Sequence, residues 1–167
     1  MNILITGGLG HIGTHLLSFI NKIRKLNKVY IIDNNSNNRI NSIFNYKHKK
    51  LNLILEDLSD KKCFKKIKHK IDIVIHLASI TDAESSVKNK ERVFNNNFKS
   101  FLNIIQFSKK NKCKLIHISS TSVYGSNAKL VDEDCNELKP QSPYAEVKLL
   151  EENYIKKIKN IDYITLR

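Results

Sequence analysis

A tyrosine and a lysine stand four residues apart, at Tyr144 and Lys148, in a segment with helical periodicity. On a helix this spacing places the phenol and the ammonium on one face. A phenol is a poor base at neutral pH, but a nearby ammonium favours the phenolate. The hydroxyl run 119–122 follows a predicted strand and can hydrogen-bond a reacting oxygen. A tyrosine and a lysine at this spacing also occur by chance on exposed helix faces. The additional presence of the hydroxyl run strengthens the prediction of a proton-transfer site.

A glycine-rich turn lies near the start of the chain, in the sequence Thr6-Gly7-Gly8-Leu9-Gly10-His11-Ile12-Gly13. It falls directly between a predicted strand and a predicted helix. A side chain at Gly10 would block the approach of a pyrophosphate to the backbone, and Gly13 allows close packing of helix and strand. The helix N-terminus adds unpaired N–H groups and a favourable dipole. The pattern predicts a dinucleotide site.

An acidic residue, Asp33, closes the second predicted strand twenty residues after Gly13. A carboxylate at this position accepts hydrogen bonds from the adenosine ribose and repels the 2'-phosphate of NADP. The residues that follow, 34–36, supply no adjacent cation, although Arg39 is near in sequence. The alternative interpretation is a solvated residue that opens a loop. We predict NAD as the cofactor.

The elements that must position these residues alternate between short β-branched runs and longer helical segments. The predicted strands are residues 2–6, 28–32, 51–56, 72–76, 114–119 and 162–166. The predicted helices are residues 11–25, 60–68, 90–111 and 142–159. The polar segments 34–50 and 127–143 are predicted connections. This rhythm predicts an α/β fold, a doubly wound parallel Rossmann sheet of strand order 3-2-1-4-5-6 that binds ligands at its carboxyl edge.

The length and composition of the chain fit one domain, and we expect residues 1–167 to form an NAD-binding Rossmann domain without a C-terminal substrate domain. No apolar run is long enough to cross a membrane, and no signal peptide precedes the first strand, so a cytoplasmic location is expected. The cysteines are Cys63, Cys113 and Cys135, an odd number without a CxxC pair. This spacing indicates neither a disulfide framework nor a metal site.

The formal charge of +13 raises nucleic-acid binding as a candidate function. The lysines are spread over predicted helices and loops, however, and arginine is scarce. This distribution is typical of a composition bias rather than of a nucleic-acid surface. We therefore expect no nucleic-acid partner, while excess positive charge favours an anionic nucleotide ligand.

Seven motifs occur in order along nearly the whole chain: TGGLGHIG, IIDNNS, LEDLSD, VIHLAS, the asparagine at 97, ISSTSVYGS and PQSPYAEVKLLEE. Together they resemble the extended short-chain dehydrogenase/reductases, above all their NAD-dependent nucleotide-sugar epimerases and dehydratases, of the UDP-glucose 4-epimerase type. The resemblance implies a nucleotide-sugar substrate and a Rossmann fold, and it covers only the N-terminal part of such enzymes.

The resemblance also implies roles for the matching positions. Ser120 matches the catalytic hydroxyl, Tyr144 the base, and Lys148 the residue that binds the nicotinamide ribose and favours the phenolate. The implied cofactor-binding residues are Gly7, Gly10, His11, Ile12, Gly13, Asp33, Asn34, Asn35, Ser36, Asp57, Leu58, Leu77, Ala78, Ser79, Asn97, Tyr144 and Lys148. No metal site is implied.

Three departures from the family pattern qualify these roles. Thr121 and Ser122 stand where the dehydratases have Asp and Glu, so the acid and the base needed for dehydration are missing. Val147 replaces a small hydroxyl residue and Ser100 replaces a glycine. Family members are also about twice this length, and the part without a counterpart here carries most of the sugar pocket.

The function that follows is an NAD-dependent nucleotide-sugar 4-epimerase acting through a keto-sugar intermediate. The alternatives are a reductase or dehydratase of the same family, and a non-catalytic NAD-binding fragment. The resemblance further implies a homodimer formed through the helices 90–111 and 142–159. Their apolar positions serve a core as readily as an interface; these are Phe94, Phe98, Phe101, Ile105, Leu149, Leu150 and Tyr154.

Overall fold

The computed structural model describes the whole chain except residues 21, 45, 47–49, 82–86 and 127–129. Parts of the predicted helix 11–25 and of both predicted connections therefore lie outside the described residues. The elements are β1 (Asn2–Thr6), α1 (His11–Ile20), β2 (Lys28–Asp33), η1 (Ile40–Ile43), β3 (Leu51–Leu55), η2 (Lys61–Lys66), β4 (Ile73–His76), α3 (Lys90–Asn111), β5 (Lys114–Ile118), η3 (Thr121–Tyr124), α4 (Pro143–Lys157) and β6 (Tyr163–Leu166).

The six strands form one parallel sheet in the order β3-β2-β1-β4-β5-β6. The predicted Rossmann topology is therefore confirmed. The strand order reverses between β1 and β4, and the carboxyl ends of both strands open onto the crevice where such sheets bind ligands. The six predicted strands agree with the observed ones to within one residue at each end.

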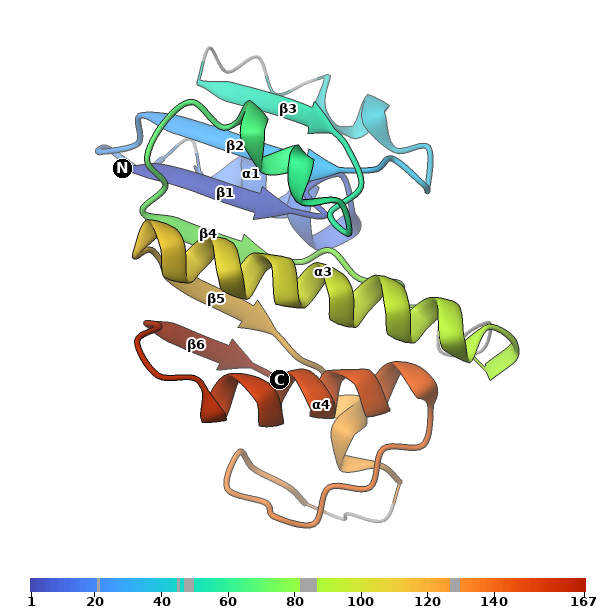
Figure 1. The fold of residues 1–167 in the computed structure, drawn as a ribbon. Helices are drawn as coiled ribbons and strands as arrows, with labels where there is room; N and C mark the ends of the chain where they lie inside the picture. Colours follow the sequence, from blue (N-terminus) through green and yellow to red (C-terminus); the bar gives the residue numbers. More distant parts are fainter. Residues whose placement is uncertain (21, 45, 47–49, 82–86, 127–129) are drawn as a thin grey trace.

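Helices cover the sheet in two layers, because the strands are apolar on both faces. Figure 1 shows α3 and α4 on the near face and α1, fainter, on the far face. Phe101 of α3 and Ile155 of α4 pack with Leu115 in the near core. Leu17 of α1 packs with Ile5 and Ile31 in the far core. The site at the carboxyl edge therefore rests on a sheet held from both sides.

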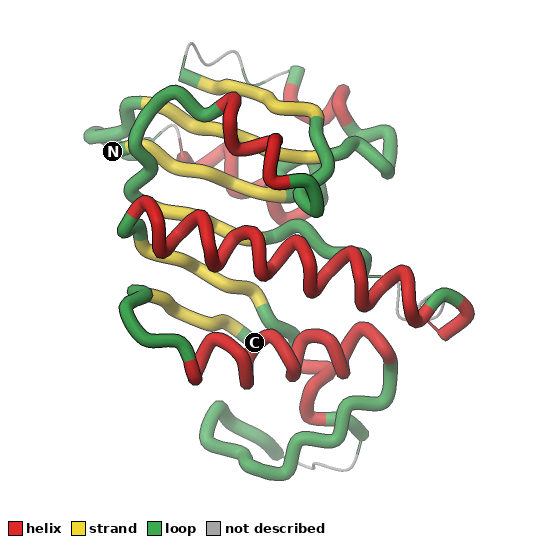
Figure 2. The backbone as a smooth tube through the Cα atoms, in the orientation of Figure 1, coloured by secondary structure: helices red, strands yellow, loops and turns green. Residues whose placement is uncertain are grey.

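The two long helices confirm the predictions for 90–111 and 142–159, with α4 two residues shorter at its C-terminal end. Ser142 caps α4, since its Oγ accepts a hydrogen bond from the N–H of Ala145 at 3.2 Å. Pro143 occupies the first turn, where its missing N–H costs nothing. The helices α3 and α4 run side by side, as Figure 2 shows, and Tyr144 and Lys148 of α4 line the crevice.

Two predicted helices are wrong in length or type. The segment 60–68 forms the 3-10 helix η2, because the Asp60 side chain accepts from the N–H of Lys62 and Ile67 turns back to an extended conformation. The predicted helix 11–25 ends at Ile20. Beyond it, backbone hydrogen bonds join residues three positions apart instead of four. The connection 34–50 also holds the short helix η1.

The far face of the sheet is bare at β5 and β6 in the described chain. Register places Ile116 beside Ile164 and Ile118 beside Leu166, on the side opposite α3 and α4. Ile164 is 43% exposed and Leu166 50% exposed. Four large aliphatic side chains on one sheet face form an apolar surface of the kind that another segment or protein normally covers.

Candidate cofactor and active site

A pocket of about 600 Å³ lies at the carboxyl edge of the sheet, between the glycine turn, the loop after β4 and the helices α3 and α4. Most of the residues predicted from the sequence line it. They are Gly7, Gly10, His11, Ile12, Gly13, Asp33, Asn34, Asn35, Ser36, Asp57, Leu58, Leu77, Ala78, Ser79, Tyr144 and Lys148. Ser120 and Asn97 are absent from this lining.

The glycine turn is shaped by close backbone contacts. Gly7 has a φ of +67°, and a Cβ there would meet the backbone of Ala78 at 2.6 Å. A Cβ at Gly13 would meet Gly8 at 2.6 Å, so this glycine packs against the turn rather than against the strand body. At Gly10 a Cβ would meet only the Gly7 carbonyl oxygen, at 3.1 Å. The space beyond Gly10 is therefore open toward the pocket.

Asp33 joins the glycine turn to the loop after β2. Its Oδ2 accepts from the N–H of Leu9 at 3.0 Å, and its Oδ1 accepts from the N–H of Asn35 at 2.8 Å. Each carboxylate oxygen has a second lone pair, so both can still accept hydroxyl groups of a ribose. Arg39 also lines the pocket near this loop.

Asp57 lies on the pocket wall beyond β3. Burial raises the pKa of its carboxyl, but hydrogen bonds from Ser59 and Asn34 outweigh burial and hold that pKa below its usual value. The carboxylate is charged and fixed in place. It can accept hydrogen bonds, as expected of the residue that the family resemblance places beside the adenine.

Tyr144 and Lys148 both line the pocket from α4. Tyr144 is half-buried, whereas Lys148 is only 3% exposed. The Lys148 Nζ donates a hydrogen bond to Glu151 Oε2 at 2.8 Å. The Lys148 ammonium is thus held within the protein, and Tyr144 and Lys148 line the same pocket from one helix, as their spacing of four residues predicts.

Ser120 lies outside the pocket wall and caps η3. Its Oγ accepts from the N–H of Ser122 at 3.2 Å and lies 2.7 Å from the Ser122 Oγ. Ser119 lines the pocket instead, and its Oγ donates to Glu152 Oε1. Burial raises the pKa of Glu152, but hydrogen bonds from Arg167 and Ser119 outweigh it, so this pKa is below its usual value.

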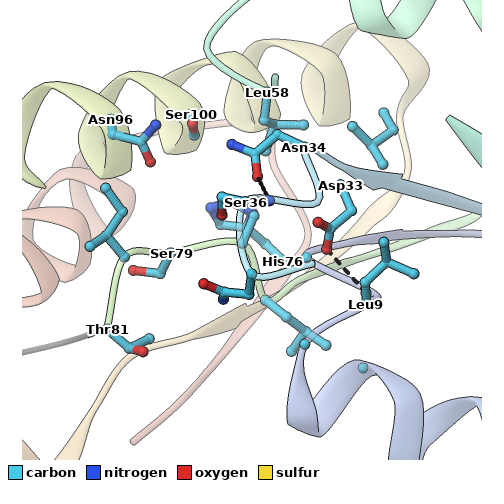
Figure 3. A pocket seen from close by; sticks show the side chains of 18 of the residues that line it. Leu9, Asp33, Asn34, Ser36, Leu58, His76, Ser79, Thr81, Asn96 and Ser100 are labelled. Atoms are coloured by element: carbon cyan, nitrogen blue, oxygen red, sulfur yellow. Dashed lines mark hydrogen bonds between the residues drawn. The ribbon is translucent and has the colours of Figure 1, made fainter. Parts of the chain in front are cut away.

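Asn97 shapes the pocket indirectly. It is 1% exposed, and its side chain accepts from the N–H of Ile80 at 2.8 Å and donates to the carbonyl of the same residue at 3.0 Å. This pair of bonds pins the loop after β4 to α3. The neighbouring residue Asn96, on the next helical face, lines the pocket itself (Figure 3).

The sequence prediction missed further lining residues: Leu9, Ile32, Asn37, Arg39, Glu56, His76, Ile80, Thr81, Arg92, Asn96, Ser100, Ile118 and Ser119. His76 is the most informative of them. It ends β4 within the VIHLAS motif, and its Nε2 has no hydrogen-bond partner among the described residues. Burial, followed by Lys148 and His117, holds the pKa of His76 well below 6.5. The motif that contains His76 was a usable signal.

Two positions that depart from the family pattern, Ser100 and Val147, carry side chains that fit inside the fold. Ser100 is 3% exposed and lines the pocket from α3, and Val147 is buried at 2% exposure. Cys63 and Cys113 are also buried. Among the described residues, no cluster of three or more metal-ligating side chains occurs, and no helix combines the length and apolarity needed to cross a bilayer.

The sequence profile of the NAD dependent epimerase/dehydratase family matches residues 3–167. The chain belongs to this family. A bifunctional UDP-glucose 4-epimerase and UDP-xylose 4-epimerase of Pisum sativum is 32% identical over 173 aligned residues. That alignment covers 96% of the chain and 48% of the relative.

Solved structures of family members superpose on the whole chain. The UDP-N-acetylglucosamine 4-epimerase of Methanobrevibacter ruminantium, in complex with UDP-N-acetylmuramic acid, is 34% identical, with a TM-score of 0.87 over 99% of this chain and 54% of that one. The UDP-glucose 4-epimerase of Thermus thermophilus, in complex with NAD, is 26% identical, with a TM-score of 0.85 over 100% of this chain and 54% of that one. The chain spans about half the length of these relatives.

The pocket fits NAD, the cofactor of this family. The open space beyond Gly10 admits a pyrophosphate at the α1 N-terminus. Two buried polar atoms of residues that line the pocket, His76 Nε2 and Ser79 Oγ, have no hydrogen-bond partner among the described residues. Asp33 retains free lone pairs toward a ribose. The residues present therefore satisfy what a dinucleotide requires.

Proposed function

We propose that this chain is the cofactor-binding part of a nucleotide-sugar 4-epimerase that works through a keto-sugar intermediate. One observation carries the proposal: Tyr144 and Lys148 share a single pocket with the glycine turn. In the proposed enzyme, Tyr144 is the base and Lys148 is its activating cation, next to the site of the cofactor. The relatives described above are 4-epimerases of UDP sugars, which supports a nucleotide sugar as the substrate class.

In the proposed reaction, the Tyr144 phenolate takes a proton from the sugar hydroxyl and later returns it. Lys148 favours the phenolate and binds the nicotinamide ribose, and Ser120 hydrogen-bonds the reacting oxygen. NAD supplies a reversible hydride acceptor. Asp33 and Asp57 hold the adenosine end, while the glycine turn and the α1 N-terminus hold the pyrophosphate.

We further propose that residues 1–167 act as an NAD-binding domain and that a separate substrate part completes the site. The bare apolar face at Ile116, Ile118, Ile164 and Leu166 supports this, as does coverage of about half of each relative. Hydride transfer requires the sugar within about 3 to 3.5 Å of its acceptor. The 167-residue chain assayed alone is therefore expected to bind NAD without turnover.

The test joins the chain to the C-terminal part of a 4-epimerase relative and measures conversion of UDP-glucose into its 4-epimer. Tyr144→Phe is expected to lower the rate at least about 100-fold with NAD binding nearly unchanged, because the phenol acts on the moving proton. Lys148→Met should lower the rate and also weaken NAD binding. Turnover that is insensitive to Tyr144→Phe would contradict the proposal, and net release or consumption of NADH would indicate a reductase.

The position of Ser120 favours a second candidate, an NAD-binding chain without catalysis. Ser120 caps η3 outside the pocket wall, whereas Ser119 lies on that wall. In the joined protein, the epimerase proposal predicts that Ser120→Ala lowers the rate more than Ser119→Ala does. No turnover in the joined protein, with NAD binding intact, would favour the second candidate.

We also propose a homodimer through α3 and α4. Phe94, Leu150 and Tyr154 are between 37% and 41% exposed, while Phe101 and Ile105 belong to the core. The interface is therefore narrower than the sequence pattern indicates. Sedimentation at about tens of micromolar should give a dimer that Leu150→Glu dissociates, and a clean monomer before substitution would reject it.

A further inference from the structure

Four polar residues form one row across four neighbouring strands. Register pairs Thr6 of β1 with His76 of β4, and His76 with His117 of β5. It pairs His117 in turn with Thr165 of β6. Thr6, His76 and His117 are at most 1% exposed on a face that is otherwise packed with aliphatic and aromatic side chains. Buried polar residues in such a core need a reason to be there.

The row meets α4 at Glu151. Its Oε2 accepts hydrogen bonds from His117 Nε2 at 2.9 Å and from Lys148 Nζ at 2.8 Å. The side chains of all three residues are at most 4% exposed. His117 Nδ1 lies 3.4 Å from Thr165 Oγ1, so both ring nitrogens are engaged. A hydrogen-bonded path therefore runs from Thr165 on the edge strand β6 through His117 and Glu151 to Lys148 on the pocket wall.

The charges in this cluster are balanced. Burial lowers the pKa of His117 more than its hydrogen bond to Glu151 raises it, and burial also lowers the pKa of His76. Both rings are therefore neutral near neutral pH. The remaining carboxylate near His117, Glu152, is paired with Arg167. Glu151 is thus the counter-charge available to the Lys148 ammonium inside the protein.

We infer that Glu151 and His117 are positioning residues that hold Lys148 as a charged ammonium at the wall of the cofactor pocket. Burial disfavours an isolated ammonium, and the Glu151 carboxylate offsets that cost. His117 holds the carboxylate through its Nε2–H, and Thr165 contacts the other ring nitrogen, Nδ1. The role of this ammonium toward NAD and Tyr144 rests on the proposed function. The contact of the ammonium with Glu151 does not depend on that function.

The first test observes Lys148 directly, without cofactor. In protein labelled with ¹⁵N at the lysine side chains, the Nζ signal of Lys148 is identified by its loss in Lys148→Arg. In the unaltered chain the ammonium protons of Lys148 should exchange slowly with water, because burial and the hydrogen bond to Glu151 protect them. In Glu151→Gln and in His117→Phe the same protons should exchange faster with water.

Controls separate positioning from general damage. Glu152→Gln removes an equally buried carboxylate one residue along α4 that pairs with Arg167, and it should leave the Lys148 signal unchanged. Glu151→Asp, which keeps the carboxylate, should leave the Lys148 signal closer to that of the unaltered chain than Glu151→Gln does. Amide spectra of each variant check that the fold is retained, and His117→Phe gives a second readout if Glu151→Gln unfolds.

A second readout connects the inference to the site. Glu151→Gln should weaken NAD binding about tenfold although the residue is absent from the pocket lining. Exchange of the Lys148 ammonium protons with water that is as slow in Glu151→Gln and His117→Phe as in the unaltered chain would overturn the inference. Absence of NAD binding in the unaltered chain, with the signal changes as expected, would instead overturn the proposed function.

Discussion

Asp33 Oδ2 accepts a hydrogen bond from the N–H of Leu9 at 3.0 Å, so the carboxyl end of β2 is tied to the glycine turn. Asp33 therefore also holds the glycine turn in place, a contact that the sequence pattern did not predict. Asp33→Ala should weaken NAD binding and narrow the preference for NAD over NADP, because a repulsive charge is lost. Calorimetric titration with both dinucleotides measures this. Equal affinities in the unaltered chain would contradict the assigned role.

Two glycines of the same turn should separate binding from folding. Gly10→Val is expected to abolish NAD binding with a smaller loss of stability, because its Cβ points into open pocket space. Gly13→Ala should lower the free energy of unfolding by about 1–3 kcal/mol, because its Cβ would overlap Gly8 at 2.6 Å. Denaturation by urea gives the stabilities. The reverse ranking of the two variants in stability would show that the turn is packed differently.

The buried Lys148 and Glu151 pair should be strongly coupled. Lys148→Met leaves a buried carboxylate without a counter-charge and should cost ~3–5 kcal/mol of the free energy of unfolding. Adding Glu151→Gln should recover part of that loss. The control is the exposed pair Lys90 and Glu146, where Lys90→Met should cost at most about 1 kcal/mol. Additive effects of the first two substitutions would rule out the coupling.

Stability should fall on mild acidification. His76 and His117 have lowered pKa values in the folded chain, whereas the unfolded chain titrates near 6.5. Below that pH the unfolded state binds more protons, so the free energy of unfolding should decrease by up to about 1.4 kcal/mol per pH unit for each histidine. The lowered carboxyl pKa values of Asp57 and Glu152 act only at lower pH. Unfolding at about pH 7.5 and about pH 5.5 measures this, and His117→Phe should flatten the slope.

Sequence periodicity was sufficient to predict the strand order, because strand, glycine turn and helix occur at spacings that few other folds accommodate. The Tyr144 and Lys148 pair was equally accessible, since both residues belong to one helix. The partnership of His117 with Glu151 was not, because it depends on strand register and on which helix covers β5. The 3-10 geometry of η2 was missed because a competing Asp60 side chain decides it.

Titration of the isolated chain with NAD measures whether residues 1–167 form a working NAD site. We expect saturable one-to-one binding that Gly10→Val abolishes and that Tyr144→Phe leaves nearly unchanged, because Gly10 lines the space for the pyrophosphate and the proposed role of Tyr144 is to move a substrate proton. Absence of binding by the folded, unaltered chain, or binding that survives Gly10→Val, would contradict this expectation.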